Sequence, residues 1–243
     1  MNINSIPKQY IIKFSKKEYL EQLKQGKIYF KESKFFKNIE ENHIGDSREG
    51  KIKVNPNTIP KSEDIIYQIM RKTEELNFFK KKDDKTPIFC CSIIDDKIIN
   101  IIDERHYDFR KEFIGEMKKW GNCFILINLD EFLYKLNEAC KKQEIYYYAN
   151  KVEYDQRERI LTYQQAQLEL TFFSFLSFYH KIKDYKWQNE FRITLLSKNK
   201  NKQIILENKD SIIIDIGPLK DAVIYEFYDL YNIGIKVIEN NRK

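Results

Sequence analysis

The chain has 243 residues and carries 43 Lys and Arg against 37 Asp and Glu, a formal net charge of +6. Hydrophobic residues make up 42% of the sequence and aromatic residues 14%, enough to fill a core, so a wholly disordered chain is excluded. The longest apolar runs fall far short of the roughly 20 residues of a membrane-spanning helix, and the first residues resemble no secretion signal. We therefore expect a cytoplasmic protein without a membrane partner.

Composition also narrows the kinds of site. The seven glycines form no glycine-rich phosphate-binding motif. The four cysteines form no CxxC pair, which favours reduced thiols over disulfides or a structural metal site. Cys90 and Cys91 lie in the apolar run PIFCCSII and are interpreted as core residues rather than nucleophiles. Lysine is abundant together with Asn, Ile and Tyr, as A+T-rich coding would produce, so the lysine count alone is weak support for a polyanionic partner.

Hydrophobic spacing and turn residues predict helices interspersed with strands along the whole chain. In chain order we expect a strand at 9–14, a helix at 16–25 ended by Gly26, a strand at 26–30, a polar segment at 34–50, a loop at 55–60, a helix at 63–72, a charged tip at 80–85, strands at 87–94 and 122–128, a helix at 129–142, a strand at 145–152, a helix at 162–179, strands at 191–196, 203–206 and 211–216, a helix at 219–231 and a strand at 234–238.

These elements follow no regular strand–helix–strand repeat, and no linker separates two halves. The pattern therefore predicts a single α+β domain over residues 1–243, with a mixed, mostly antiparallel central sheet flanked by helices.

The most informative segment is KIKDYKWQNEFRITLL at 181–196, where a polar aromatic turn leads directly into a strand. Gln188 and Glu190 stand two residues apart, so in an extended chain they point to the same side. The carboxylate could stabilise a developing cation or accept a proton, and the amide could orient a nucleophile. The alternative is a pair of surface contacts, in which Glu190 pairs with Arg192 or Lys186.

The stretch QNEFRITLL resembles the end of the ADP-ribosyltransferase fold, where a QxE or ExE motif immediately precedes a strand. This resemblance implies a split central sheet and NAD as co-substrate. It implies that Glu190 is the catalytic carboxylate, which contacts a ribose hydroxyl and stabilises the oxocarbenium-like transition state as nicotinamide leaves. Gln188 is then the residue on the acceptor side. Under this reading a Glu190→Ala variant loses nicotinamide release while its melting temperature stays nearly unchanged.

The same resemblance implies further cofactor-binding residues. The family's central strand supplies a serine beside the nicotinamide ribose, and IFCCS offers Ser92 for that place. We also assign Arg48, Tyr29 and Arg192 to the binding of NAD. The family's first strand usually supplies Arg or His, and here the chain departs from the pattern, because QYIIKF and GKIYF contain neither.

A second resemblance covers residues 23–193. The pieces LKQGKIYFKESKFFKNIEENHIGDSREG, PIFCCSI, WGNCFILINLDEF and FYHKIKDYKWQNEFRI follow one another as in an uncharacterised family of bacterial and phage proteins. Members of that family often resemble defence-linked or mobile-element genes. The resemblance therefore implies a toxin or an anti-phage effector and names no activity.

Within that block, the loop GDSREG at 45–50 concentrates two carboxylates and a guanidinium between glycines. Arg48 could clamp a phosphate with two hydrogen bonds, and Asp46 and Glu49 could hold Mg²⁺ together with substrate phosphates. The alternative is an exposed turn with local hydrogen bonds between side chains and backbone.

Three functions fit these observations. We favour an NAD-consuming enzyme of the ADP-ribosyltransferase type, whose partner is a protein or nucleic-acid acceptor or a regulatory protein. The second function is a metal-dependent nuclease or phosphoesterase, with Mg²⁺ held by Asp46, Glu49 and Glu190. In this alternative Lys181 or Lys183 neutralises the leaving phosphate. The third is a non-catalytic module that binds nucleic acid or protein through the lysine runs at 80–82, 118–119 and 141–142.

Overall fold

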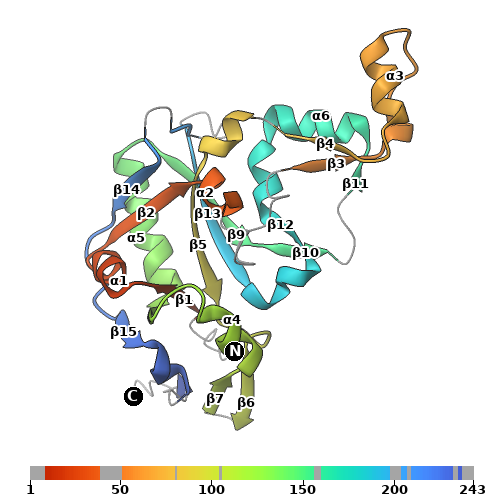
Figure 1. Cartoon of the computed structure of the whole chain (residues 1–243). Helices are drawn as coiled ribbons and strands as arrows, with labels where there is room; N and C mark the ends of the chain where they lie inside the picture. Colours follow the sequence, from red (N-terminus) through yellow and green to blue (C-terminus); the bar gives the residue numbers. More distant parts are fainter. Residues whose placement is uncertain are drawn as a thin grey trace, which may run out of the picture.

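The computed structural model describes residues 9–38, 51–79, 81–103, 106–155, 160–197, 204–206, 209–231 and 235–236. The loop residues Asp46, Arg48 and Glu49 lie outside these ranges. The described elements, in which η marks a 3-10 helix, are shown in Figure 1. In chain order they are β1 (Tyr10–Ser15), α1 (Lys17–Lys24), β2 (Lys27–Glu32), α2 (Ser33–Asn38), β3 (Ile52–Val54), η2 (Pro56–Thr58), α3 (Ile65–Lys72), β4 (Leu76–Phe78), η3 (Lys81–Lys85), β5 (Pro87–Ile93), β6 (Ile99–Asp103), β7 (His106–Phe109), α4 (Lys111–Met117), β8 (Cys123–Asn128), α5 (Leu129–Lys142), β9 (Tyr146–Lys151), β10 (Glu153–Asp155), β11 (Ile160–Leu161), α6 (Tyr163–Phe172), η4 (Ser174–Tyr179), β12 (His180–Ile182), η5 (Lys183–Gln188), β13 (Glu190–Leu196), β14 (Ser211–Asp215), β15 (Val223–Glu226), η6 (Phe227–Tyr231) and β16 (Ile235–Lys236).

The largest sheet is antiparallel at every described strand pair and is organised around β5. Along one edge of β5 lies β13, followed by β9. The other edge is shared by two strands. Strand β2 pairs with the start of β5, where Lys31 lies opposite Ile88, and β1 pairs with its end, where Ile12 lies opposite Ser92. The sheet therefore forks at residues 89–91 of β5, and we call the space between β1 and β2 the sheet fork.

Helices α1 and α5 cover one face of this sheet. Phe132 and Leu136 of α5 pack with Leu20 of α1 against Phe89 and other inward side chains of the sheet. Helix α5 begins at the predicted residue because the side chain of Asn128 accepts a hydrogen bond from the backbone N–H of Glu131 (2.9 Å), as an N-cap does.

The opposite face of the sheet carries the alternate side chains of β5, among them Cys90 and Ser92. Aromatic residues of η4, such as Phe178, pack against Cys90, and Met117 of α4 packs against Ile12 and Phe14 of β1. Because both faces are covered, every residue of β5 is buried. This explains why the strand reads as a continuous apolar run rather than an alternating one.

Smaller sheets extend the fold. Strand β3 pairs with β4 and, in parallel, with β11, and with α6 they enclose a separate small core. Helix α3 projects away from the main sheet beyond this module (Figure 1). Strand β10 pairs in parallel with β12, so that Tyr154 lies opposite Lys181. The predicted α+β class, with a mostly antiparallel sheet flanked by helices, is confirmed.

Two predicted helices are wrong. The helix predicted at 162–179 begins with a capping box at Thr162 but ends at Phe172. The next residue, Phe173, leaves helical geometry (φ −137°), and residues 174–179 form the 3-10 helix η4, whose aromatic side chains pack against the sheet. The segment predicted as a helix at 219–231 contains strand β15, which pairs with β8, followed by η6. The run Val223–Ile224–Tyr225 favours a strand, and packing decides the outcome.

Two further segments differ from expectation. In the predicted strand at 203–206, residues 204–206 form no strand, although the Ile204 N–H donates to the carbonyl of Leu195 (3.2 Å). The charged tip predicted at 80–85 is partly buried, because Asp83 in η3 is only 3% exposed. Its backbone carbonyl accepts a hydrogen bond from Ser33 Oγ (2.6 Å), which ties the segment to α2. None of the helices in the described ranges is long and apolar enough to pass through a bilayer.

Gly26 supplies a test of the junction between α1 and β2. It has φ +91°, and a Cβ at this position would lie 2.0 Å from the carbonyl oxygen of Gly217. We expect Gly26→Ala to lower the free energy of unfolding by roughly 2 kcal/mol or more, because left-handed geometry and a backbone clash add up. Urea unfolding measures the effect. Gly115→Ala is the matched control, because Gly115 lies in α4 and a Cβ added there would meet no neighbouring atom within 4 Å. This variant should raise the free energy of unfolding by about 0.5–1 kcal/mol. An unchanged unfolding midpoint for Gly26→Ala would contradict the close approach.

Candidate functional site

The bend before β13 is fixed by Asn189. Helix η5 ends at Gln188, and Asn189 takes the left-handed conformation (φ 40°, ψ 51°), which asparagine tolerates better than most residues. Its side-chain amide donates to the carbonyl of Ile93 (2.7 Å) and to Asp95 Oδ1 (2.7 Å). Residues 188–190 are therefore not extended, which was the condition for Gln188 and Glu190 to point to the same side. Gln188 and Glu190 are instead brought together by a left-handed residue that is tied to the end of β5.

Glu190 is buried in an ionic cluster. Glu190 is only 7% exposed. Its carboxylate accepts two hydrogen bonds from Arg192, one from Nε (2.6 Å) and one from Nη2 (3.1 Å). Lys181 Nζ lies 2.9 Å from Glu190 Oε2, the oxygen that also accepts from Arg192 Nη2. Lys181 Nζ donates as well to Gln188 Oε1 (2.8 Å). Of the two partners considered for Glu190, Arg192 is present, and Lys181 takes the place considered for Lys186. The contacts are buried rather than on the surface.

These neighbours set the ionisation of Glu190. Burial alone would raise the pKa of the carboxyl group, but the charges and hydrogen bonds of Arg192 and Lys181 outweigh it and hold the pKa well below its ordinary value. The group is therefore ionised at neutral pH and is a weak base. The hydroxyl of Tyr154 accepts a hydrogen bond from the Glu190 backbone N–H (2.9 Å), and burial raises the pKa of this tyrosine well above its ordinary value. Tyr154 is thus neutral.

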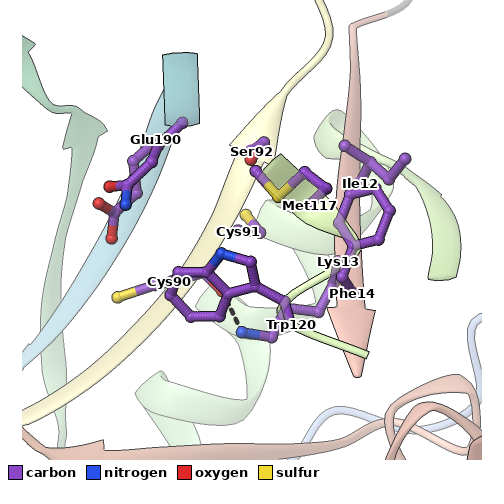
Figure 2. Close-up of a pocket in the computed structure, with 10 residues that line it drawn as sticks. Ile12, Lys13, Phe14, Cys90, Cys91, Ser92, Met117, Trp120 and Glu190 are labelled. Atoms are coloured by element: carbon purple, nitrogen blue, oxygen red, sulfur yellow. Dashed lines mark hydrogen bonds between the residues drawn. The ribbon is translucent and has the colours of Figure 1, made fainter. Parts of the chain in front are cut away.

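Gln188, Glu190 and Ser92 border one small cavity, which we call the acid cavity. Its volume is about 30 Å³, and Lys13, Trp120 and apolar side chains complete its lining. Ser92 lies directly opposite Glu190 in the β5–β13 register. Figure 2 shows the strand that carries Ser92 between the strand of Glu190 and the strand of Lys13. The three residues that the resemblance to ADP-ribosyltransferases implied, and that are far apart in the sequence, are thus brought together.

A larger pocket of about 640 Å³ opens in the sheet fork, and we call it the fork pocket. No Asp or Glu of the described ranges lines it. Its polar lining is dominated by lysines and its apolar lining by aromatic residues. These are Lys13, Lys27, Lys31 and Lys119, with Tyr19, Tyr29, Phe35, Phe36, Phe89 and Trp120. Tyr29, predicted to bind a cofactor, thus lines the fork pocket and not the acid cavity.

The two spaces adjoin. Lys13, Phe14, Cys90 and Trp120 line both of them. Lys13 Nζ donates to the backbone carbonyl of Cys90 (2.7 Å) and lies 5.4 Å from the centre of the Phe89 ring. The ammonium group therefore stands between the fork pocket and the acid cavity, next to the part of β5 that neither β1 nor β2 pairs with.

Sequence reasoning missed Lys13 and Trp120. A signal for Lys13 was present, because it is the one charged residue inside the strand YIIKFS. Trp120 follows α4 and carried no signal, because its place depends on how α4 packs against β1. Arg192 was predicted to bind NAD, but it is 1% exposed, lines neither the acid cavity nor the fork pocket, and pairs with Glu190. Its position gives it a structural role.

The interpretation of Cys90 and Cys91 as core residues agrees with their burial. Burial raises the pKa of the Cys91 thiol to about 12, so little thiolate forms at neutral pH. No group of three or more His, Cys, Asp or Glu side chains in the described ranges is arranged to hold a metal ion. Asp46, Glu49 and Arg48 are outside those ranges, so the Mg²⁺ site and the phosphate clamp stay predictions.

No protein-family model matches the chain, and neither a curated protein nor a solved structure is significantly similar to it.

The ionic cluster predicts a large cost for neutralising Glu190 alone. In Glu190→Gln, Arg192 and Lys181 stay buried without a counter-charge, so we expect a loss of roughly 3–5 kcal/mol in the free energy of unfolding. The expectation that Glu190→Ala leaves the melting temperature unchanged therefore does not hold. The double variant Glu190→Gln with Lys181→Met restores the original charge balance and should recover part of the loss. Urea unfolding of both variants measures this. Equal stability of Glu190→Gln and wild type would contradict the buried cluster.

The lowered pKa of Glu190 also predicts a pH dependence of stability. Since the folded state keeps this carboxylate ionised below its ordinary pKa of about 4.5, the unfolded state binds more protons in that range. The contribution is fully present above pH 4.5 and is lost as the pH falls below it toward the folded pKa. We expect urea midpoints measured from pH 7 to pH 3 to fall less steeply for the charge-balanced double variant than for wild type. Parallel curves would show that Glu190 titrates normally.

Proposed function

We propose that the chain is an NAD-consuming enzyme of the ADP-ribosyltransferase type, which breaks the bond between nicotinamide and ribose. One arrangement carries the proposal. An ionised carboxylate at Glu190 lies with Ser92 and Gln188 around a cavity, and this cavity adjoins a basic, aromatic pocket in a forked sheet. A forked sheet and a Gln-x-Glu motif before a strand are the features that the resemblance to this family implies.

The chemistry of the fork pocket suits a dinucleotide. Its volume of about 640 Å³ falls in the usual range of small-molecule sites. NAD carries two negatively charged phosphates, which the lysines of the pocket attract and which acidic side chains would repel. Adenine and nicotinamide are flat rings, which aromatic side chains such as Tyr29 and Trp120 can bind by stacking. Lys13 is the lysine that lines both the fork pocket and the acid cavity, and it would contact the phosphate or ribose at that end.

In this proposal Glu190 acts by its charge. As the glycosidic bond breaks, its electron pair moves to the ring nitrogen of nicotinamide, and positive charge develops on the ribose. A carboxylate that stays ionised stabilises this charge at short range. Arg192 and Lys181 hold the carboxylate in place, and Lys181 also holds the Gln188 amide. Ser92 lies opposite Glu190 and would hydrogen-bond the ribose or the nicotinamide amide.

A second candidate function is nucleotide binding without chemistry. One observation favours it, because Arg192 and Lys181 together bring one more positive charge than Glu190 neutralises, so the cluster as a whole attracts anions. In that case the fork pocket would bind NAD or another nucleotide, and no nicotinamide would be released.

An enzyme that consumes NAD harms the cell that makes it, which fits a toxin or an anti-phage effector that acts in the cytoplasm. The partner would then be a protein that restrains or triggers it.

The proposal is tested with purified full-length chain and NAD, by calorimetric titration and by an assay for free nicotinamide. Lys13→Met keeps the aliphatic stem of the side chain and removes its charge, so we expect NAD affinity to fall at least about tenfold, as for loss of a hydrogen bond to a charged group. Lys16→Met is the matched control, because Lys16 is exposed next to β1 and lines neither pocket. Its affinity should be unchanged.

The outcomes separate the two candidates. Binding with nicotinamide release, both weakened by Lys13→Met, supports the enzyme. Binding without release supports the module without chemistry. Equal loss of binding in Lys13→Met and Lys16→Met, or no binding by the wild type, contradicts a nucleotide site in the sheet fork.

A further inference from the structure

The acid cavity contains a hydrogen-bond donor without an acceptor. The indole Nε1 of Trp120 is buried and has no hydrogen-bond partner among the described residues. A buried N–H in this state costs free energy unless a water or ligand satisfies it. The other polar groups around the cavity are the Glu190 carboxylate, the Ser92 hydroxyl, the Gln188 amide and the Lys13 ammonium, which donates to the Cys90 carbonyl. The Trp120 N–H thus offers a hydrogen-bond donor, and the Glu190 carboxylate offers a charged acceptor.

The size of the cavity limits what can satisfy these groups. The acid cavity's volume of about 30 Å³ exceeds the roughly 10–15 Å³ that a site with two to four polar partners needs to hold a water. An arginine or glutamate side chain of another protein, or a nucleotide base, is several times larger. Glu190 and Gln188 are 7% and 2% exposed, so a macromolecule does not reach them from outside.

We propose that the acid cavity holds the water that accepts the ribosyl group, so that the product is free ADP-ribose. This inference rests on the proposed function and selects hydrolysis over transfer to a macromolecule. The water accepts a hydrogen bond from Trp120 Nε1 and donates to Glu190. The ribose is too large to enter the acid cavity completely, so it lies at the boundary that Lys13, Cys90 and Trp120 share, with its reacting carbon toward Ser92 and Glu190.

The reaction balances without a further reactant. The bond from the ribose carbon to the nicotinamide nitrogen breaks, and its electron pair goes to nicotinamide. The water oxygen forms the new bond to that carbon and then loses a proton, which passes along the hydrogen bond to Glu190 and on to solvent. NAD and water give ADP-ribose, nicotinamide and a proton. A weak base is sufficient, because water bound to a ribosyl cation is a strong acid.

Product analysis of the wild-type chain tests the inference. NAD labelled in the adenine ring is incubated with the full-length protein and an excess of three acceptors: an arginine-containing peptide, a lysine-containing peptide and a single-stranded DNA oligonucleotide. We expect free ADP-ribose in amounts equal to the nicotinamide released, with no label on any acceptor or on the protein itself. Label on an acceptor, with nicotinamide released in equal amount, overturns the inference and leaves the proposed function standing. Absence of nicotinamide release overturns both.

Trp120→Phe tests the position of the water. Phenylalanine keeps an aromatic wall for the fork pocket but removes the N–H, so we expect kcat for nicotinamide release to fall at least about tenfold while KM for NAD changes less than threefold. Trp187→Phe is the matched control, because Trp187 packs in the same apolar cluster and lines neither cavity. Its kcat should be unchanged. Full activity of Trp120→Phe overturns the placement of the water at Nε1. If Trp120→Phe does not fold, the product analysis alone decides.

Discussion

The site depends on the pairing of Glu190 with Arg192 and Lys181 beneath the surface. Taking three charges out of water costs free energy, and well-packed apolar side chains of similar size would hold the same space at equal or lower cost. The cluster is satisfied by further contacts, since Arg192 also donates to the Phe178 carbonyl and Lys181 to Gln188. A chain that keeps such a cluster gains a carboxylate whose charge and direction are both fixed. The proposed chemistry requires a carboxylate of this kind.

The sheet fork places a pocket beside the cavity that Glu190 borders. In a regular sheet the neighbours of β5 would pair along its full length and close the edge. Here β2 leaves β5 after Ile88 and β1 joins it at Ser92, so three residues of β5 face a pocket instead of a strand. The same strand carries Ser92 on the side of Glu190. A single strand therefore connects the wall of the fork pocket to the carboxylate, and this connection explains why the two spaces adjoin.

Much of the fold could be predicted from the sequence, because local signals agreed with the packing. The apolar spacing of α5 predicted its bounds correctly, and the run of apolar residues identified β5 as a buried strand. The misplaced elements are those where packing overrides propensity, as in the segment that contains β15. The pairing order around β5 was invisible, since register depends on contacts between segments that are far apart in the chain.

The candidate site was predictable only in part, because some of its residues carry a local signal and others are placed by the fold alone. Gln188 and Glu190 were found by their spacing, although their shared direction comes from the left-handed Asn189 rather than from an extended chain. Ser92 came from a family resemblance, and its register opposite Glu190 agrees with that choice. Lys181 was considered only as a residue that could neutralise a leaving phosphate in the metal-dependent alternative. Only the fold shows that β12 carries it into the interior, where its ammonium group meets two side chains of the motif.

The order of these parts along the chain has a consequence for how the protein is made. The fork pocket is built mainly from residues that precede residue 121, whereas Lys181, Gln188, Glu190 and Arg192 belong to the last third of the sequence. A ribosome therefore completes the walls of the pocket long before it adds the acid. A nascent or truncated chain that stops before β13 has most of the pocket lining but lacks the carboxylate altogether.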